Sequence, residues 1–108
     1  MKVENMLSPN GNRVANQFLI TDNNGNEYFQ SYNSVIAKRS KGQIYLDVSF
    51  WDYSVTTGKY RNLFLGEGIA ETRKKIESGE YILTNLNEEF KVESSFWARV
   101  VLEDELPT

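Results

Sequence analysis

Aromatic, hydroxyl and cationic side chains crowd into one short stretch of this chain, residues 51–68, which we call the junction. Seven of them fall within nine positions: Tyr53, Ser54, Thr56, Thr57, Lys59, Tyr60 and Arg61. The cations could neutralise phosphates, the hydroxyls could donate hydrogen bonds, and Trp51 or Tyr53 could stack on a base. The junction is therefore a candidate site for single-stranded nucleic acid or another partner, with Trp51, Tyr53, Lys59 and Arg61 as its contacts.

A structural interpretation of the same residues stays open. Tyr60 and Phe64 have helical spacing and could belong to the core, Thr57 could cap a helix, and Lys59 and Arg61 could be solvated. Periodic aromatic residues usually pack against a core, which favours this interpretation over a binding surface.

Other chemistry has weaker support from the spacing. Asp47, Asp52 and Glu67 could supply oxygen ligands to a hard divalent cation, but they follow no known metal-binding spacing. Tyr53 or Tyr60 beside Arg61 could act as a nucleophile, which normally needs further metal ligands or an arginine-rich pocket. Gly66 and Gly68 follow a helical pattern instead of a strand, which indicates a helix end and not a nucleotide loop. We expect no metal and no cofactor.

The chain contains no cysteine and no histidine. It therefore lacks thiolate nucleophiles, disulfides, the commonest general base and the commonest transition-metal ligand. Serine–histidine–aspartate hydrolases, zinc peptidases and histidine-dependent nucleases are excluded. We expect a protein that is not an enzyme.

The length of 108 residues suits one domain with its own core. Strands are predicted over residues 16–22, 28–32, 34–38 and 44–50, with a hairpin turn at 23–26 and a clear period of two in the last strand, whose face would carry Ile44, Leu46, Val48 and Phe50. Short connections favour an antiparallel arrangement. The fold class expected is α+β, an antiparallel sheet of three to five strands with one or two short helices packed on one face.

A first helix is predicted over residues 59–65, capped by Thr56 or Thr57, with Tyr60, Leu63 and Phe64 on its buried stripe and Gly66 at its end. A second helix over residues 69–77 carries Arg73, Lys74 and Lys75, and Glu71 should pair with Lys75. A short strand follows at residues 81–83. We divide the chain into an N-terminal arm (1–12), a compact domain (13–87) and an acidic C-terminal extension (88–108).

Negative charge is concentrated in the extension. Its six acidic and two basic residues give residues 88–108 a net charge of −4. Because the whole chain has a net charge of −3, residues 1–87 have a net charge of +1. This acidic strip could meet a basic partner, with an aromatic anchor within it. Its candidate contacts are Glu93, Trp97, Glu103, Asp104 and Glu105. Residues 96–102 alternate as a strand would, and a helix beginning at Ser94 is the open alternative. No apolar run is long enough to span a membrane, so we expect a cytoplasmic protein.

Four segments carry a family resemblance: SPNGNRVANQF, FQSYNSVIAK, WDYSVTTGKYRNLFLGE and KKIESGEYILTNLN. Together they resemble a group of small uncharacterised proteins encoded by phages and plasmids of Gram-positive bacteria. The resemblance covers about residues 8–87, and the WDYS block is its most specific part. It brings no catalytic residue with it.

The resemblance implies an accessory protein of a mobile genetic element. The expected function is to bind and inhibit a host defence nuclease, in the manner of anti-CRISPR or anti-restriction proteins, with a Cas effector or a restriction subunit as the partner. The alternative is single-stranded nucleic-acid binding through residues 51–61.

Overall fold

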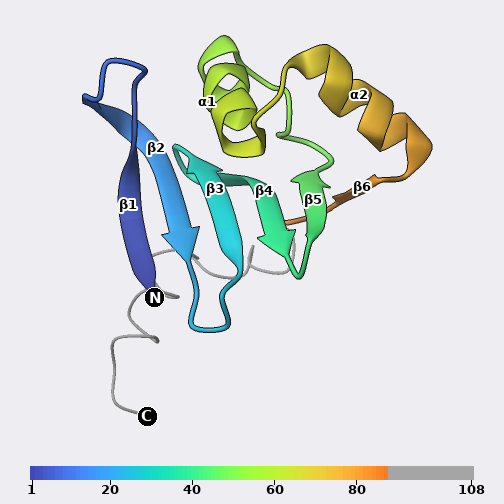
Figure 1. Ribbon diagram of the computed structural model, residues 1–108, viewed down its shortest axis with the longest axis horizontal. Helices are drawn as coiled ribbons and strands as arrows, with labels where there is room; N and C mark the ends of the chain where they lie inside the picture. Colours follow the sequence, from blue (N-terminus) through green and yellow to red (C-terminus); the bar gives the residue numbers. More distant parts are fainter. Residues whose placement is uncertain (88–108) are drawn as a thin grey trace.

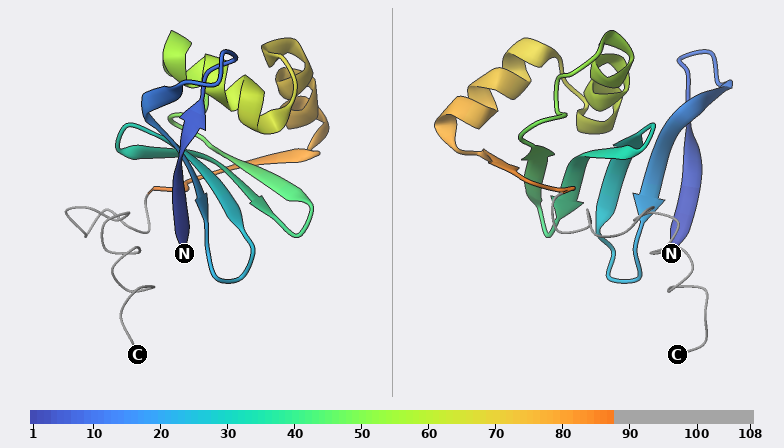
Figure 2. Two further views of the ribbon diagram at one scale, coloured as in Figure 1. Left: turned by 60° about the vertical axis from the view of Figure 1, so that its left-hand side comes forward. Right: turned by 180° about the vertical axis from the view of Figure 1, so that it is seen from behind.

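The computed structural model describes residues 1–87, which form one sheet with both helices on the same face (Figures 1 and 2). The strands are β1 (Lys2–Leu7), β2 (Arg13–Thr21), β3 (Glu27–Ser31), β4 (Ser34–Ser40), β5 (Gln43–Asp47) and β6 (Tyr81–Thr84). The helices are α1 (Val55–Leu65) and α2 (Ile69–Ser78). The predicted α+β class is confirmed.

The strands lie in the sheet in the order in which they occur in the sequence. β1 to β5 form an antiparallel meander, whereas β6 pairs with β5 in parallel. The sheet is therefore mixed and has six strands, where three to five antiparallel strands were expected. The physical reason is the connection between β5 and β6, which holds both helices and is long enough for a parallel crossover.

The N-terminal residues belong to the sheet. β1 pairs with β2 as an edge strand, where the sequence predicted an arm. The turn at residues 8–12 connects these two strands, with the Gly11 N–H donating to the Ser8 carbonyl and Gly11 at a φ of 83°. β1 shows no clean apolar alternation because almost all of its side chains are exposed.

The hairpin between β2 and β3 forms as predicted, with Gly25 at a φ of 84°. The Asp22 carboxylate holds the turn by accepting hydrogen bonds from the backbone N–H groups of Asn24 and Asn26 and from the Tyr28 hydroxyl. Burial alone would raise the pKa of Asp22, but these bonds and one from the Asn26 side chain outweigh it and lower the pKa.

The core lies between the sheet and the helices. α1 contacts β3 and β4, and α2 contacts β6. Phe29 of β3 stacks on Phe64 of α1, with ring centroids 6.1 Å apart. Arg39 of β4 also contacts Phe64: its guanidinium lies 4.5 Å from the Phe64 ring centroid and donates to the Phe64 carbonyl. The remaining buried members of the cluster are Ile36, Ala37, Leu46, Tyr60 and Tyr81.

Both helices begin and end with local signals. α1 is capped by Ser54, whose hydroxyl accepts from the Thr57 N–H, so the predicted caps Thr56 and Thr57 were wrong. Gly66 ends α1 in the left-handed conformation, as predicted, and Gly79 ends α2 in the same way. Within residues 1–87, neither helix is long and apolar enough to cross a membrane.

β5 stops at Asp47, three residues earlier than predicted. The buried Asp47 carboxylate accepts from the N–H groups of Ser49 and Phe50, which turns the chain and leaves Val48 53% exposed. Its other oxygen accepts from the Leu86 N–H and the Asn87 side-chain amide. Asp47 thus ties the loop after β5 to the chain after β6.

We expect Asp47→Ala to lower the free energy of unfolding by about 3 kcal/mol or more, because four donors lose a buried, charged acceptor. Chemical denaturation monitored by circular dichroism measures this loss. Glu80→Ala, at an exposed acid just before β6, is the matched control and should change little. Equal effects of the two substitutions would contradict the role given to Asp47.

Candidate functional site

The junction is built around the guanidinium of Arg61, which is only 2% exposed. Its Nη1 donates to the Trp51 carbonyl at 2.8 Å and to Asp52 Oδ1 at 3.1 Å, and its Nη2 donates to Asn62 Oδ1 at 2.9 Å. The guanidinium also lies 5.4 Å from the Trp51 ring. Arg61 therefore fastens the loop at residues 51–52 to α1.

The four junction residues chosen from the sequence do not form one surface. Trp51 is half-buried and turns inward with Arg61, whereas Tyr53 and Lys59 are exposed. Tyr53 packs edge-on against Phe50, with ring centroids 5.5 Å apart. The structural interpretation is right that Tyr60 and Phe64 are core, and wrong that Arg61 is solvated.

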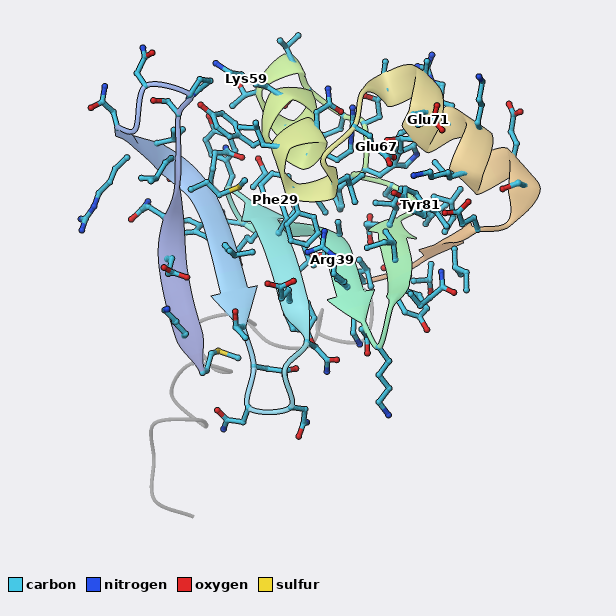
Figure 3. All side chains as sticks on the ribbon, in the orientation of Figure 1. Phe29, Arg39, Lys59, Glu67, Glu71 and Tyr81 are labelled. Carbon is cyan, nitrogen blue, oxygen red and sulfur yellow. The ribbon has the colours of Figure 1, made fainter. Side chains whose placement is uncertain are left out.

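The outward side of α1 carries a row of three side chains that we call the α1 stripe: Val55, Lys59 and Leu63. They are spaced four residues apart and so lie on one side of the helix. Val55 is 91% exposed and Leu63 is 48% exposed. Figure 3 shows Lys59 on the side of α1 that faces away from the sheet. The predicted burial of Leu63 was wrong, because Thr57, Tyr60, Arg61 and Phe64 form the inward side.

The three carboxylates considered as metal ligands are separate and each holds a structural contact. Asp47 accepts from backbone and amide donors, Asp52 accepts from Arg61 and Arg73, and Glu67 accepts from side chains of α2 and β6. Among residues 1–87, no group of three or more acidic side chains is arranged to hold a metal ion.

Glu67, between the helices, is the centre of a hydrogen-bonded cluster (Figure 3). Its Oε1 accepts from Lys75 Nζ at 2.7 Å and from the Tyr81 hydroxyl at 2.9 Å, and its Oε2 accepts from the Thr72 hydroxyl. Burial alone would raise the pKa of Glu67, but these bonds outweigh it and lower the pKa. The hydrogen bond from Lys75 to Glu67 raises the pKa of Lys75. Burial raises the pKa of Tyr81, and its hydrogen bond to Glu67 raises it further.

Three consecutive basic residues of α2, Arg73, Lys74 and Lys75, have different surroundings. Arg73 and Lys75 make ion pairs, and Lys74 is exposed. Lys75 pairs with Glu67 instead of the predicted Glu71, because Glu67 is held close by Thr72 and Tyr81. Arg73 reaches Asp52 at 3.4 Å. Arg73 and Lys75 are therefore each paired with a carboxylate.

Sequence reasoning missed a buried polar contact between the sheet and α1. Ser31 of β3 and Thr57 of α1 share a hydrogen bond of 2.9 Å between their hydroxyl oxygens. Gln17 lies opposite Ser31 in the register and is fully buried, and its amide has no hydrogen-bond partner within the described chain. No periodicity marks these residues, because each occupies a position that an apolar side chain would normally fill.

The candidate contacts of the C-terminal extension lie outside the described residues. They are Glu93, Trp97, Glu103, Asp104 and Glu105. The predicted strand at residues 96–102 and its helical alternative lie there as well.

We expect Arg61→Ala to lower the free energy of unfolding by about 2–4 kcal/mol, because it removes three hydrogen bonds and leaves Asp52 without its buried partner. Arg61→Lys should not restore stability, since the single ammonium nitrogen of lysine cannot replace the two terminal nitrogens of the planar guanidinium. Denaturant unfolding measures both variants. Lys59→Ala, on the exposed side of the same helix, should change stability by less than about 0.5 kcal/mol.

Glu67 should make stability depend on pH in the acid range. Because its folded-state pKa lies below the ordinary value of 4.5, its contribution is present above that pH and is lost as the pH falls through the lowered pKa. Between neutral and acid pH, the wild type should therefore lose more unfolding free energy than Glu67→Gln. Urea denaturation at several pH values compares the two, and parallel curves would contradict this role.

Comparison with known proteins places the chain in one family. No curated protein and no solved structure matches it. A family model matches residues 1–82, which span all six strands except the end of β6 and include both helices. The chain is thus a member of a family of unknown function, DUF8033.

Proposed function

We propose that this protein is a non-enzymatic accessory protein of a mobile genetic element, and that it binds and inhibits a host defence nuclease in the cytoplasm. A Cas effector or a restriction subunit is the partner we favour. The mobile-element setting rests on the resemblance of residues 8–87 to small phage and plasmid proteins. The observation that carries the binding role is the α1 stripe.

The α1 stripe has the composition of a protein-binding surface. Val55 and Leu63 present two aliphatic side chains to solvent, separated by about 12 Å along the helix axis. Lys59 lies between them, and Tyr53 is exposed just before the helix. Removing exposed apolar side chains from water stabilises a complex, and tyrosine is common at the centre of interfaces. A complementary partner would offer an apolar surface with an acidic group opposite Lys59.

Four charged residues in and near the junction support a binding role over catalysis. Asp47, Asp52, Arg61 and Glu67 are each engaged by structural hydrogen bonds within the fold. A group that holds the fold together in this way is poorly placed to move protons, since each change of its charge would weaken those bonds. What this part of the molecule offers a partner is its shape and its exposed apolar side chains.

Single-stranded nucleic-acid binding through residues 51–61 has less support. The buried Arg61 cannot reach a phosphate, which leaves Lys59 as the exposed cation of that segment. Tyr53 remains available to stack on a base. Fluorescence anisotropy with labelled oligonucleotides at low salt tests this alternative, and salt-sensitive binding that is lost in Tyr53→Ala would favour it over the inhibitor role.

The experiment for the inhibitor role uses purified Cas effectors and restriction enzymes of a Gram-positive host, with complex formation and target cleavage as the two measurements. We expect one of them to form a complex and lose cleavage activity. Val55→Asp combined with Leu63→Asp should weaken inhibition at least about tenfold, because two charges would be placed in an apolar contact. The variant must first show a wild-type circular dichroism spectrum.

Ile82→Asp is the matched control, because Ile82 is an exposed aliphatic residue of β6 on the face of the sheet opposite α1. It should inhibit like the wild type. The proposal fails when no defence nuclease of the host is bound or inhibited. Inhibition that survives the double substitution would remove the α1 stripe from the interface.

A further inference from the structure

The free edge of β1 is the feature from which we draw a second conclusion. β1 pairs with β2 on one side, and within residues 1–87 no strand pairs with its other side. Neither helix covers β1, since α1 lies over β3 and β4 and α2 lies over β6 (Figures 1 and 2). An uncovered edge is a template for pairing with another strand.

The register shows which backbone groups are free. In the β2–β3 ladder the Asp22 N–H donates to the Asn26 carbonyl, and the Tyr32 N–H donates to the Asn16 carbonyl. Alternate residues of an antiparallel strand bond to the same neighbour, so the even-numbered residues of β2 bond to β3 and the odd-numbered ones bond to β1. Leu19 and Thr21 are paired with Glu4 and Lys2. The backbone groups of Val3 and Asn5 therefore point outward from the edge.

The side chains of β1 are complementary to a second copy of β1. Lys2 and Glu4 lie on the helix side of the sheet, with Nζ and Oε1 3.7 Å apart. When two β1 strands run antiparallel with a twofold axis at Val3, Lys2 of each copy faces Glu4 of the other. An axis at Glu4 would instead place two carboxylates opposite each other. An axis at Asn5 would include the irregular pairing between Asn5 and Leu7. The attraction between Lys2 and Glu4 and the regular pairing of β1 up to Asn5 therefore favour the register with the axis at Val3.

We propose that the protein self-associates through antiparallel pairing of β1 with β1 of a second copy, with Val3 at the twofold axis. The outward N–H and C=O groups of the two Val3 residues then bond to each other. The four charges form an alternating cluster beside the axis. Because this axis is perpendicular to the sheet, both helical layers lie on the same face of one continuous sheet.

Self-association would also create a larger binding surface. The helix side of β1 and β2 carries two adjoining hollows of about 680 and 520 Å³, which share Glu4 and Leu19 in their walls. The first also includes Met6 and Arg13. In the dimer, the hollows of both copies lie on the same face of the sheet, so the open surface beside the helices is present twice.

Analytical ultracentrifugation of the full chain tests the proposal. The weight-average mass should rise from the monomer value of 12.5 kDa toward twice that value as concentration increases. Lys2→Glu should raise the dimer dissociation constant about tenfold or more, because two attractive cross-strand pairs become repulsive. Combining Lys2→Glu with Glu4→Lys should restore dimerisation, since the charges are exchanged. Val3→Pro should abolish it by removing the outward N–H.

Amide hydrogen exchange of the wild-type protein tests the same pairing without any substitution. The amides of Val3 and Asn5 should be protected at high concentration and should exchange rapidly at low concentration. A mass of 12.5 kDa at every concentration would overturn the proposal. So would a dimer unaffected by Lys2→Glu and Val3→Pro, or a charge exchange that fails to restore association. None of these outcomes depends on whether a defence nuclease is bound.

Discussion

The buried carboxylate of Asp47 is the constraint on which the arrangement of this protein depends. A buried charge is tolerated only when hydrogen bonds replace the water it has lost. Asp47 receives those bonds from the loop after β5 and from the chain after β6, two segments almost forty residues apart, as its bond to the Leu86 N–H spans 39 positions. Its burial therefore requires that β5 and β6 end side by side. The helices between them must then carry the chain back to the end of the sheet where β5 begins, so that β6 can run parallel to β5.

Arg61 and Glu67 also join segments that are separate in the sequence, in this case within the helical layer. Arg61 fixes the start of the crossover to α1 through Trp51 and Asp52. Glu67 fixes the link between the helices to α2 and β6 through Lys75 and Tyr81. The most recognisable block of the sequence, from Trp51 to Glu67, thus supplies the polar contacts that hold the crossover together. Its density of charged and aromatic residues follows from that structural task.

The crossover determines which surfaces are left for partners. It covers β3 to β6 and leaves the helix side of β1 open, with the β1 edge beyond it. Because the inward side of α1 is occupied by Tyr60, Arg61 and Phe64, its outward side carries Val55 and Leu63 into solvent. The two surfaces on which the proposals rest, the outward side of α1 and the edge of β1, are therefore separate. The proposed binding role needs no group free to move protons, and the hydrogen bonds of Asp47, Asp52 and Glu67 are consistent with it.

The sequence by itself determined the α+β class, the β2–β3 hairpin, both helices and the glycine that ends α1, because these depend on local turn chemistry and on periodicity within one element. The strand β1, the parallel pairing of β6 and the end of β5 at Asp47 were decided by tertiary structure, since each depends on partners distant in the sequence. The same holds for the site. Tyr53 and Lys59 are on the surface, but the sequence could not distinguish an exposed Arg61 from a buried one. Its burial is set by the Trp51 carbonyl and the Asp52 carboxylate, which only the folded loop brings to it.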